Sequence, residues 1–449
     1  MPCLNHWQAL AATKEQCIDN GGASAPSLAS GRATPFFGWA FYEVRGMTER
    51  TSNALDWVTG SDAPEMNSLD IGFMALTDSA PLVVAATQGF AQPYGLSLNL
   101  KRQTSWAGLR DRLVSGQLHA AHSLYGLIYA VELGIGGGPA TDMAILMGLN
   151  QNGQCINLSH ELQQAGVITP EALDQRAHQN GTRLTFAQTF PTGNHAMWLY
   201  YWLASQGIHP LDDVNSVVVP PTQMAQHLRA GRIDGFCVGE PWGASAVQQQ
   251  LGFTMATSQA IWPDHPGKVL GCTREFVEQN PNTARALIMA VLEASRFIEQ
   301  NPHNLYSTAQ LLCGADYLDT ALDCIEPRLL GHYSDGLGNH WQDPHPVRFH
   351  NQGQVNYPWL SDGMWFMTQF RRWGLLREDP DYLTVASRVQ QLALYRQAAT
   401  ALGIDVPTGN LRSSQLIDGK VWDGSDPAGY ARSFKLHSLA DSAPAVASR

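Results

Sequence analysis

Short strand-like and helix-like segments alternate from residue 69 onward, and this alternation restricts the chain to an α/β fold. Residues 69–73 alternate apolar with polar or small side chains, which predicts a strand. A polar turn at residues 77–80 leads into Pro81, and proline suits the first turn of a helix. Residues 96–100 alternate again. The segment therefore predicts a strand, a helix and a second strand in succession.

One helix–glycine–strand pattern occurs twice. Residues 113–118 (LVSGQL) are echoed by residues 228–233 (LRAGRI). In both copies we expect a helix to end at a glycine in the left-handed conformation, before a buried strand. Two similar lobes would produce such an echo, although the same unit also recurs in unrelated α/β proteins.

The later part of the chain is mainly helical. Residues 284–298 and 381–398 have helical periodicity, and an Asn-Pro or Asp-Pro start signal precedes each. Both ends of the chain are rich in small and polar residues, and Met47 is an alternative start. The expected organisation is a loose N-terminal extension, a discontinuous first lobe, a second lobe and a C-terminal tail: residues 1–66, 67–157 with 263–436, 158–262, and 437–449.

The charge balance excludes some classes of partner. The formal net charge is −11, and no dense run of Lys and Arg occurs. A nucleic-acid groove needs a basic stripe, so no direct nucleic-acid binding is expected. Because the overall field repels anions, an anion could be held only by a few local donors. No stretch of about 18 apolar residues occurs, so no membrane-spanning helix is expected.

The N-terminal residues and the cysteines both favour a cytoplasmic location. The first basic residue is Lys14, and no apolar run, twin-arginine pair or lipobox of a targeting signal is found. The 7 cysteines are odd in number and widely spaced, without a CxxC pair. This pattern suits reduced thiols better than a disulfide framework.

Cofactor and metal motifs are weak or absent in the sequence. No GxxxxGK[ST] loop occurs, and the glycine-rich residues 134–138 run into Pro139 without the acidic residue of a dinucleotide site. His340, His345 and His350 recur at regular spacing, but prolines break any helix that would align them, and zinc ligands usually lie closer. We favour a surface loop over a metal site, and we expect neither cofactor nor metal.

Several sequence blocks, in one order, carry a resemblance to a known family. They are residues 72–83 (GFMALTDSAPLV), Ser105-Trp106 with Arg110-Asp111, residues 150–156 (NQNGQCI), 191–195 (PTGNH) with Trp198, 201–204 (YWLA), 239–242 (GEPW), 265–268 (HPGK), 355–359 (VNYPW) and 365–374 (WFMTQFRRWG). The set resembles the nitrate/bicarbonate-binding proteins of ABC importers and covers roughly residues 69–400.

The resemblance implies a two-lobed α/β fold of the type II periplasmic-binding-protein kind, with a ligand cleft between the lobes. Periplasmic members carry a signal or a lipid anchor, which is not found here. This departure points to the cytoplasmic NasS-type nitrate/nitrite sensors. Such sensors hold a NasT-type RNA-binding antiterminator and release it when the anion binds, so that response regulator is the expected partner in regulating nitrate assimilation.

Two other interpretations stay open. One is the substrate-binding component of an ABC importer for nitrate or bicarbonate. The other is an enzyme related to the thiamine-precursor synthases, which share this general fold. Those enzymes use a Cys- and His-bearing motif that we do not find in this sequence.

Nitrate is a flat monoanion, so its site needs a positive charge, in-plane donors and an apolar wall. The resemblance implies Lys268 as the charge, because nitrate-binding members have a lysine in the matching His-Pro-x-Lys segment. His195 is expected near a helix N-terminus, where free N–H groups favour anions. Gln154, after the turn at Asn152-Gly153, would donate through its amide. Trp106 would supply an apolar face and an indole N–H.

The segment Val238-Gly239-Glu240 is expected to reach the ligand through backbone N–H groups. A carboxylate beside an anion is repulsive, so we expect Glu240 to pair with Lys268 or His195, or to cap a helix. An enzyme would use it as a general base. No nucleophile or second carboxylate lies at a credible spacing, so the chain is predicted not to be an enzyme.

Overall fold

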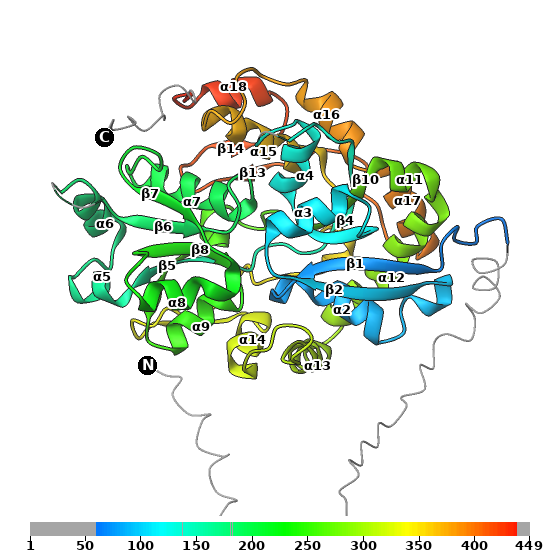
Figure 1. The fold of residues 1–449 in the computed structure, drawn as a ribbon, viewed down its shortest axis with the longest axis horizontal. Coiled ribbons are helices and arrows are strands. Elements are labelled where there is room, and N and C mark those ends of the chain that lie inside the picture. Colours follow the sequence, from blue (N-terminus) through cyan, green and yellow to red (C-terminus); the bar gives the residue numbers. More distant parts are fainter. Residues whose placement is uncertain (1–59, 137, 180, 182, 438–449) are drawn as a thin grey trace, which may run out of the picture. The chain divides into compact units, whose positions relative to one another are not determined.

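The computed structural model describes residues 60–437, except residues 137, 180 and 182. This part contains two five-stranded sheets with helices around them; in Figure 1 the first is blue to cyan except for the later strand β10, and the second is mostly green. The predictions for a loose N-terminal extension and a C-terminal tail fall mainly outside the described residues. Within residues 60–66, Glu65 accepts hydrogen bonds from the backbone N–H groups of Asn282 (3.1 Å) and Thr283 (2.8 Å).

The first sheet combines parallel and antiparallel pairs. β1 pairs in parallel with β2 and β3, and β10 lies antiparallel between β3 and β4. In spatial order the strands are β2 (Ser97–Gln103), β1 (Ser68–Met74), β3 (Ala120–Leu124), β10 (Lys268–Thr273) and β4 (Met143–Gly148). The predicted strands at residues 69–73 and 96–100 are confirmed as β1 and β2. The helix predicted at Pro81 is α2 (Ala80–Thr87).

The second sheet repeats this arrangement. β6 pairs in parallel with β7 and β8, and β5 lies antiparallel between β8 and β9. In spatial order the strands are β7 (Asn215–Val218), β6 (Thr185–Gln188), β8 (Gly235–Gly239), β5 (Gln154–Ser159) and β9 (Gly252–Thr257). Each position of the second sheet therefore has a counterpart in the first.

The sequence echo coincides with this structural repeat. The first copy comprises the end of α3 (Trp106–Val114), Gly116 at φ 74°, and the approach to β3. The second comprises the end of α8 (Met224–Arg229), Gly231 at φ 62°, and the approach to β8. Both glycines have the predicted left-handed conformation, which glycine adopts without steric cost. Because β3 and β8 hold the same place in their sheets, the echo reflects two equivalent units.

The chain crosses between the sheets twice. It passes from β4 to β5 between Gly148 and Gln154, and it returns from β9 to β10 between Thr257 and Lys268. The strands that the chain enters after each crossing, β5 and β10, both run antiparallel to their neighbours in the sheet. Gln154 and Lys268 therefore begin equivalent strands. This arrangement confirms the predicted two-lobed α/β architecture, in which the connections between the sheets bring distant segments together.

The remaining elements cover the sheets and build the C-terminal part of the fold. They are η1 (Thr77–Ser79), η2 (Gln92–Tyr94), α4 (Tyr125–Glu132), α5 (His160–Gln164), α6 (Pro170–Ala177), α7 (Asn194–Ser205), η3 (Pro221–Gln223), α9 (Trp242–Gln248), α10 (Ser258–Ile261), α11 (Arg274–Gln279), α12 (Pro281–Glu299), α13 (Pro302–Leu312), α14 (Leu322–Leu329), β11 (His332–Ser334), β12 (His340–Gln342), η4 (Asn351–Gly353), α15 (Leu360–Arg372), α16 (Tyr382–Val389), α17 (Leu392–Ala401), β13 (Ser414–Gln415), β14 (Val421–Trp422) and α18 (Pro427–Arg432).

One helix prediction is confirmed and one is wrong. Residues 284–298 lie within α12. The single helix predicted over residues 381–398 is instead two helices, α16 and α17. Gln390 between them is extended (φ −87°, ψ 118°), and the backbone N–H of Gln391 donates to the carbonyl oxygen of Ile145 in β4 at 3.0 Å. Pairing with this edge strand interrupts the helix, and no local Gly or Pro marks the break.

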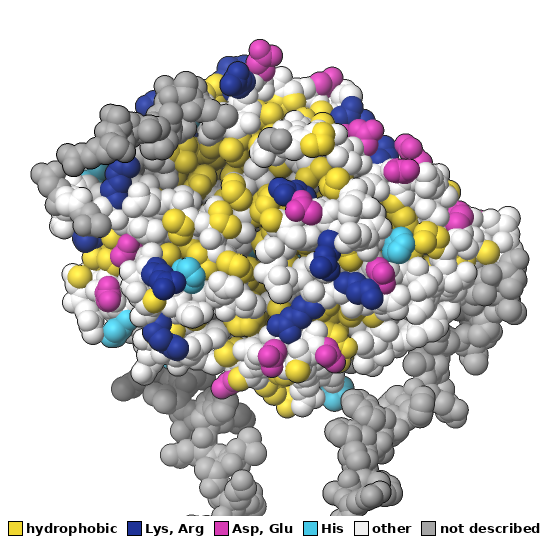
Figure 2. Space-filling model, viewed as in Figure 1, with side chains coloured by type: hydrophobic (Ala, Val, Ile, Leu, Met, Phe, Trp, Pro, Cys, Tyr) yellow, Lys and Arg dark blue, Asp and Glu magenta, His cyan; other side chains and the backbone are white. Residues whose placement is uncertain are grey.

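Two further expectations concern a basic stripe on the surface and a membrane-spanning helix. On the face drawn in Figure 2, Lys and Arg side chains lie interspersed with Asp and Glu. Within the described ranges, no helix is both long and apolar enough to cross a bilayer.

Candidate functional site

Lys268 and Gln154 begin the two strands through which the chain enters each sheet. Lys268 pairs with Leu124 at the end of β3, and Gln154 pairs with Gly239 at the end of β8. Because β3 and β8 are equivalent strands, the internal repeat brings the lysine and the glutamine to matching positions. Both are buried, with exposed fractions of 0% for Lys268 and 1% for Gln154.

The ammonium of Lys268 donates to Asp78 Oδ2 at 2.7 Å, and Asp78 is 2% exposed. Burial by itself raises the pKa of Asp78, but Lys268 and His122 outweigh it and hold the pKa below its ordinary value. Asp78 is therefore a buried carboxylate that balances the lysine charge. Asp78 was not among the predicted site residues; its position directly after a predicted strand, at the start of a helix, was the available signal.

His122 orients the same carboxylate from β3. Its Nε2 lies 2.8 Å from Asp78 Oδ1, and the backbone N–H of Met74 donates to its Nδ1 at 3.4 Å. This second contact assigns the ring proton to Nε2, which donates to Asp78. Burial lowers the pKa of His122, so the ring is neutral. The Trp106 ring lies 5.7 Å from it between centroids, which brings that predicted residue to the cluster's edge.

His195 is the second residue of α7, close to the predicted helix N-terminus. Its Nδ1 lies 2.6 Å from Thr189 Oγ1, and its Nε2 has no hydrogen-bond partner among the described residues. Burial, and then the charge of Lys268, hold the pKa of His195 well below its ordinary value, so the imidazole is neutral. A neutral ring with an open Nε2 at a helix N-terminus can donate to an anion.

Gly239 marks the point where these groups converge. A side-chain carbon at Gly239 would lie 3.2 Å from Leu76 Cδ2, 3.5 Å from His195 Nε2 and 3.6 Å from Asp78 Oδ2. Because Gln154 is directly opposite Gly239 in the ladder, its side chain extends from the same face of the sheet. Both polar atoms of its amide lack a partner in the described part of the chain. Glycine at this position therefore avoids a side chain that would crowd these polar groups.

Val238 and Glu240 contribute differently from their glycine neighbour. The Val238 side chain packs with Phe236 in the hydrophobic cluster on the opposite face, so only its backbone can face the site. Glu240 Oε2 accepts from the backbone N–H of Ala244 at 2.9 Å, in the first turn of α9, and Oε1 lies 3.2 Å from Arg328 Nε. The predicted pairing with Lys268 or His195 is wrong, whereas the alternative of a helix cap is confirmed.

Direct hydrogen bonds join the two halves around this cluster. The backbone N–H of Thr77 donates to Glu240 O at 2.8 Å, and Trp242 Nε1 donates to Ala75 O at 2.7 Å. Asn194 Nδ2, at the start of α7, donates to Gly267 O at 2.6 Å, next to Lys268. These contacts close the site, which explains why its side chains are buried.

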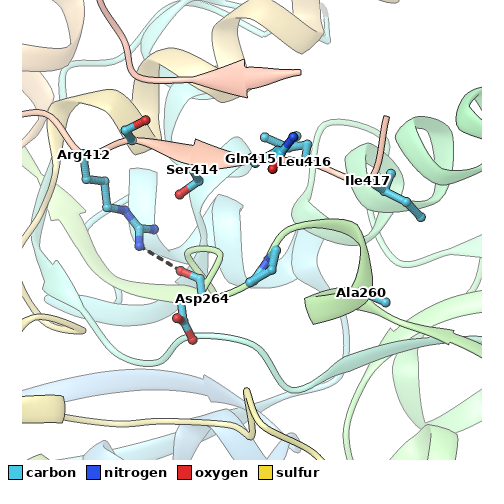
Figure 3. Close-up of a pocket in the computed structure, with 9 residues that line it drawn as sticks. Ala260, Asp264, Arg412, Ser414, Gln415, Leu416 and Ile417 are labelled. Carbon is cyan, nitrogen blue, oxygen red and sulfur yellow. Dashed lines mark hydrogen bonds between the residues drawn. The ribbon is translucent and has the colours of Figure 1, made fainter. Parts of the chain in front are cut away.

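A hollow of about 520 Å³ lies elsewhere, beside β13 (Figure 3). Arg412 projects into it, but its guanidinium already donates to both carboxylate oxygens of Asp362, at 2.7 and 2.9 Å, and to the backbone oxygen of Asp264 at 2.8 Å. The hollow is open to solvent and its guanidinium is already engaged, whereas the buried cluster has polar atoms of Gln154 and His195 that lack a partner among the described residues. The buried cluster is therefore the better candidate, despite the hollow's size.

The histidines at regular spacing do not assemble. His340 is exposed on β12, His345 lies 3.1 Å from Asp264 Oδ1, and His350 lies 2.9 Å from Asn356 Oδ1. In the part of the chain that the structure describes, no group of three or more His, Cys, Asp or Glu side chains is arranged to hold a metal ion.

Comparison with known proteins relates this geometry to a family. The NMT1-like family model matches residues 62–313. The nitrate/nitrite binding protein NrtA of Synechocystis sp. PCC 6803 is 36% identical over 395 residues, which cover 85% of this chain and 88% of the relative. The nitrate import ATP-binding protein NrtC of the same organism is 37% identical over 380 residues, covering 84% of this chain but 57% of that protein.

A solved structure agrees with the fold. The crystal structure of the periplasmic nitrate-binding protein NrtA from Synechocystis PCC 6803 matches with a TM-score of 0.79 at 34% identity, covering 83% of this chain and 100% of that one. The described chain thus has the predicted fold of the periplasmic binding proteins. With a family model over more than half its length and relatives of this similarity, the chain belongs to the NMT1-like family and is homologous to the NrtA proteins.

Proposed function

We propose that the chain binds nitrate or nitrite at the buried cluster around Gly239. The observation that carries this proposal is a set of buried polar groups, the Gln154 amide and His195 Nε2, that have no partner among residues 60–437 as described and lie near the Lys268 ammonium. A buried polar group without a partner costs about 1–3 kcal/mol. A small anion with several acceptor oxygens removes that cost at more than one group simultaneously.

The charges at the site favour a weakly hydrated monoanion. Lys268 is already paired with Asp78, so an incoming anion is held mainly by neutral donors and by the N-terminus of α7. A dianion such as sulfate has a larger desolvation cost, so the same few neutral donors favour a monoanion. Nitrate and nitrite fit this requirement, and the names of the homologous NrtA proteins support the same ligands.

The mode of binding follows from the contacts between the halves. With the site fully buried, an anion enters only when the Thr77–Glu240 and Trp242–Ala75 hydrogen bonds open. A bound anion would touch groups from both sheets and so favour the closed form, because a ligand shifts an equilibrium through its differential affinity. The proposal therefore makes the chain a binding protein that closes on its ligand, and not an enzyme.

Two roles are compatible with nitrate binding. The binding component of an ABC importer is the leading one, because the relatives' names describe nitrate binding and nitrate import. The second is a cytoplasmic sensor that releases a NasT-type antiterminator when the anion binds. The tests are fractionation of cells expressing the full chain and a pull-down of a NasT-type regulator with and without nitrate. Export of the chain favours the importer role. A regulator that binds the chain without nitrate and is released by nitrate favours the sensor role.

Binding itself is tested by calorimetric titration of the purified chain with nitrate, nitrite and bicarbonate. Tight binding of nitrate or nitrite is expected. Gln154→Met keeps the length of the side chain but removes its amide, and it should weaken nitrate binding by about 10- to 100-fold for the lost hydrogen bond. The matched control Gln226→Met changes an exposed glutamine and should bind like the original protein. Binding of bicarbonate alone, or unchanged nitrate affinity of Gln154→Met, would overturn the proposed site.

A further inference from the structure

We propose that His195 takes up a proton when the anion binds, so that the protein binds the anion and a proton together. This inference rests on the proposed function and adds a coupling between anion binding and pH. It follows from the charge balance of the cluster and from the different hydrogen-bond geometry of its histidines.

The cluster is electrically neutral before an anion enters. Asp78 pairs with Lys268, and Glu240 pairs with Arg328, and all four side chains are at most 4% exposed. A monoanion would therefore leave an uncompensated charge in a buried, low-dielectric site. Such a charge is costly unless a partner neutralises it. One proton taken up with the anion restores neutrality.

Three of the groups facing His195 are poor acceptors for that proton. Asp78 accepts Lys268 Nζ on Oδ2 and His122 Nε2 on Oδ1. His122 accepts the Met74 N–H on its remaining nitrogen, so a proton there would lose this bond. Protonation of either residue would break a buried hydrogen bond that the closed site already contains. Lys268, the third, is already an ammonium.

His265 is the remaining titratable neighbour. Its Nδ1 lies 3.0 Å from the carbonyl oxygen of Pro266, so Nδ1 carries the ring proton, and Nε2 lies 2.7 Å from Ser258 Oγ. That hydroxyl oxygen already accepts from the backbone N–H of Gln154 at 3.1 Å. A second ring proton would turn the Ser258 hydroxyl proton away from the ring and would gain no contact with the anion, because Nε2 is already engaged by Ser258. His265 therefore stays neutral when the anion binds.

His195 differs at both ring nitrogens. Its Nδ1 faces the Thr189 hydroxyl, which can either donate or accept, so the same 2.6 Å contact serves the neutral and the protonated ring. Its Nε2 faces the space beside Gly239 without a partner among the described residues. A protonated His195 would therefore keep Thr189 and make a charge-assisted hydrogen bond to the anion. Burial and the charge of Lys268 keep the ring neutral before binding.

The test is calorimetric titration with nitrate at one pH in Tris, imidazole and Bis-Tris. These cationic buffers differ in ionisation enthalpy and do not compete with an anion. The observed heat should rise with buffer ionisation enthalpy, with a slope approaching about one proton taken up, and the affinity should fall by up to about tenfold per pH unit as the pH rises. Tight nitrate binding with the same heat in every buffer would overturn the inference but leave the proposed function intact. No nitrate heat at any pH would overturn the proposed function itself.

Substitutions at His195, Thr189 and His122 test which histidine ring takes up the proton. His195→Gln keeps a neutral donor and should bind nitrate more weakly with no buffer dependence. Thr189→Val removes the hydroxyl that accepts from the protonated ring and should reduce the slope, whereas His122→Gln should retain it. A slope that persists in His195→Gln would assign the proton to another group and refute the inference. If His195→Gln does not fold, as judged by circular dichroism, the slopes of the original protein and of Thr189→Val decide the question.

Discussion

Lys268 Nζ and Asp78 Oδ2 lie 2.7 Å apart, joining residues 190 positions apart in the chain inside a closed site. The pair ties the first residue of β10 to the helix start that follows β1. Because both side chains are buried, each charge depends on the other. Variants of the proposed anion site will therefore change stability as well as binding, and the two effects need to be measured separately.

Lys268→Met should abolish detectable nitrate binding and should also destabilise the fold. Removing one partner of a buried ion pair leaves an uncompensated charge, at a cost of about 3–5 kcal/mol. In the double variant Lys268→Met/Asp78→Asn no charge is stranded, so most of that stability should return and nitrate binding should recover in part. Urea unfolding and calorimetry measure the two quantities. Complete loss of binding in the double variant would contradict an anion held mainly by neutral donors.

Gly239→Ala should weaken nitrate binding by at least about tenfold, because the new methyl group occupies the space that His195 and Asp78 border. The same methyl group contacts its neighbours at 3.2 Å or more, so the free energy of unfolding should fall by no more than about 1–3 kcal/mol. Gly409→Ala, at a position where an added carbon meets only Leu411 O at 3.9 Å, is the matched control. Equal nitrate affinity in the two variants would show that the anion binds elsewhere.

Glu240→Gln should retain nitrate binding within a few-fold but lower the free energy of unfolding. The Glu240 carboxylate caps α9 and pairs with Arg328, so its removal strands the arginine at an expected cost of about 3 kcal/mol. Denaturant unfolding checks the stability, and titration of the folded variant checks the affinity. A selective loss of affinity without loss of stability would instead mean that the carboxylate side chain acts on the ligand.

His265 should make the fold less stable in acid. Burial lowers the pKa of His265 to about 3, below the value of 6.5 expected for an unfolded chain. The unfolded state therefore binds more protons than the folded state below pH 6.5, so stability falls as the pH drops through 6.5 and continues to fall toward about pH 3. Between pH 7 and pH 5 the loss from this residue is about 2 kcal/mol. His265→Asn should show a correspondingly flatter pH dependence in urea unfolding, and an identical pH dependence would contradict this account.

Local pattern in the sequence was sufficient for much of the fold. The strands β1 and β2, the helix α2 and the duplicated helix–glycine–strand unit follow from periodicity and from the conformational freedom of glycine, which neighbouring residues carry themselves. The proximity of His195 to a helix N-terminus also followed from nearby residues. The prediction that Lys268, Gln154 and Gly239 bind the ligand came from the resemblance to a family, because no local pattern distinguishes them from other residues of their type.

The partners of these residues depended on the packing of distant segments. Asp78 meets Lys268 because β10 returns to the first sheet beside β3, and Glu240 meets Arg328 because α14 packs near α9. The break at Gln390 likewise depends on the free edge of β4, and helical periodicity contains no trace of it. Periodicity reports which face of an element is buried, but it does not report what that face will contact. The charge balance of the buried site therefore arises from long-range pairing between elements that are locally unrelated.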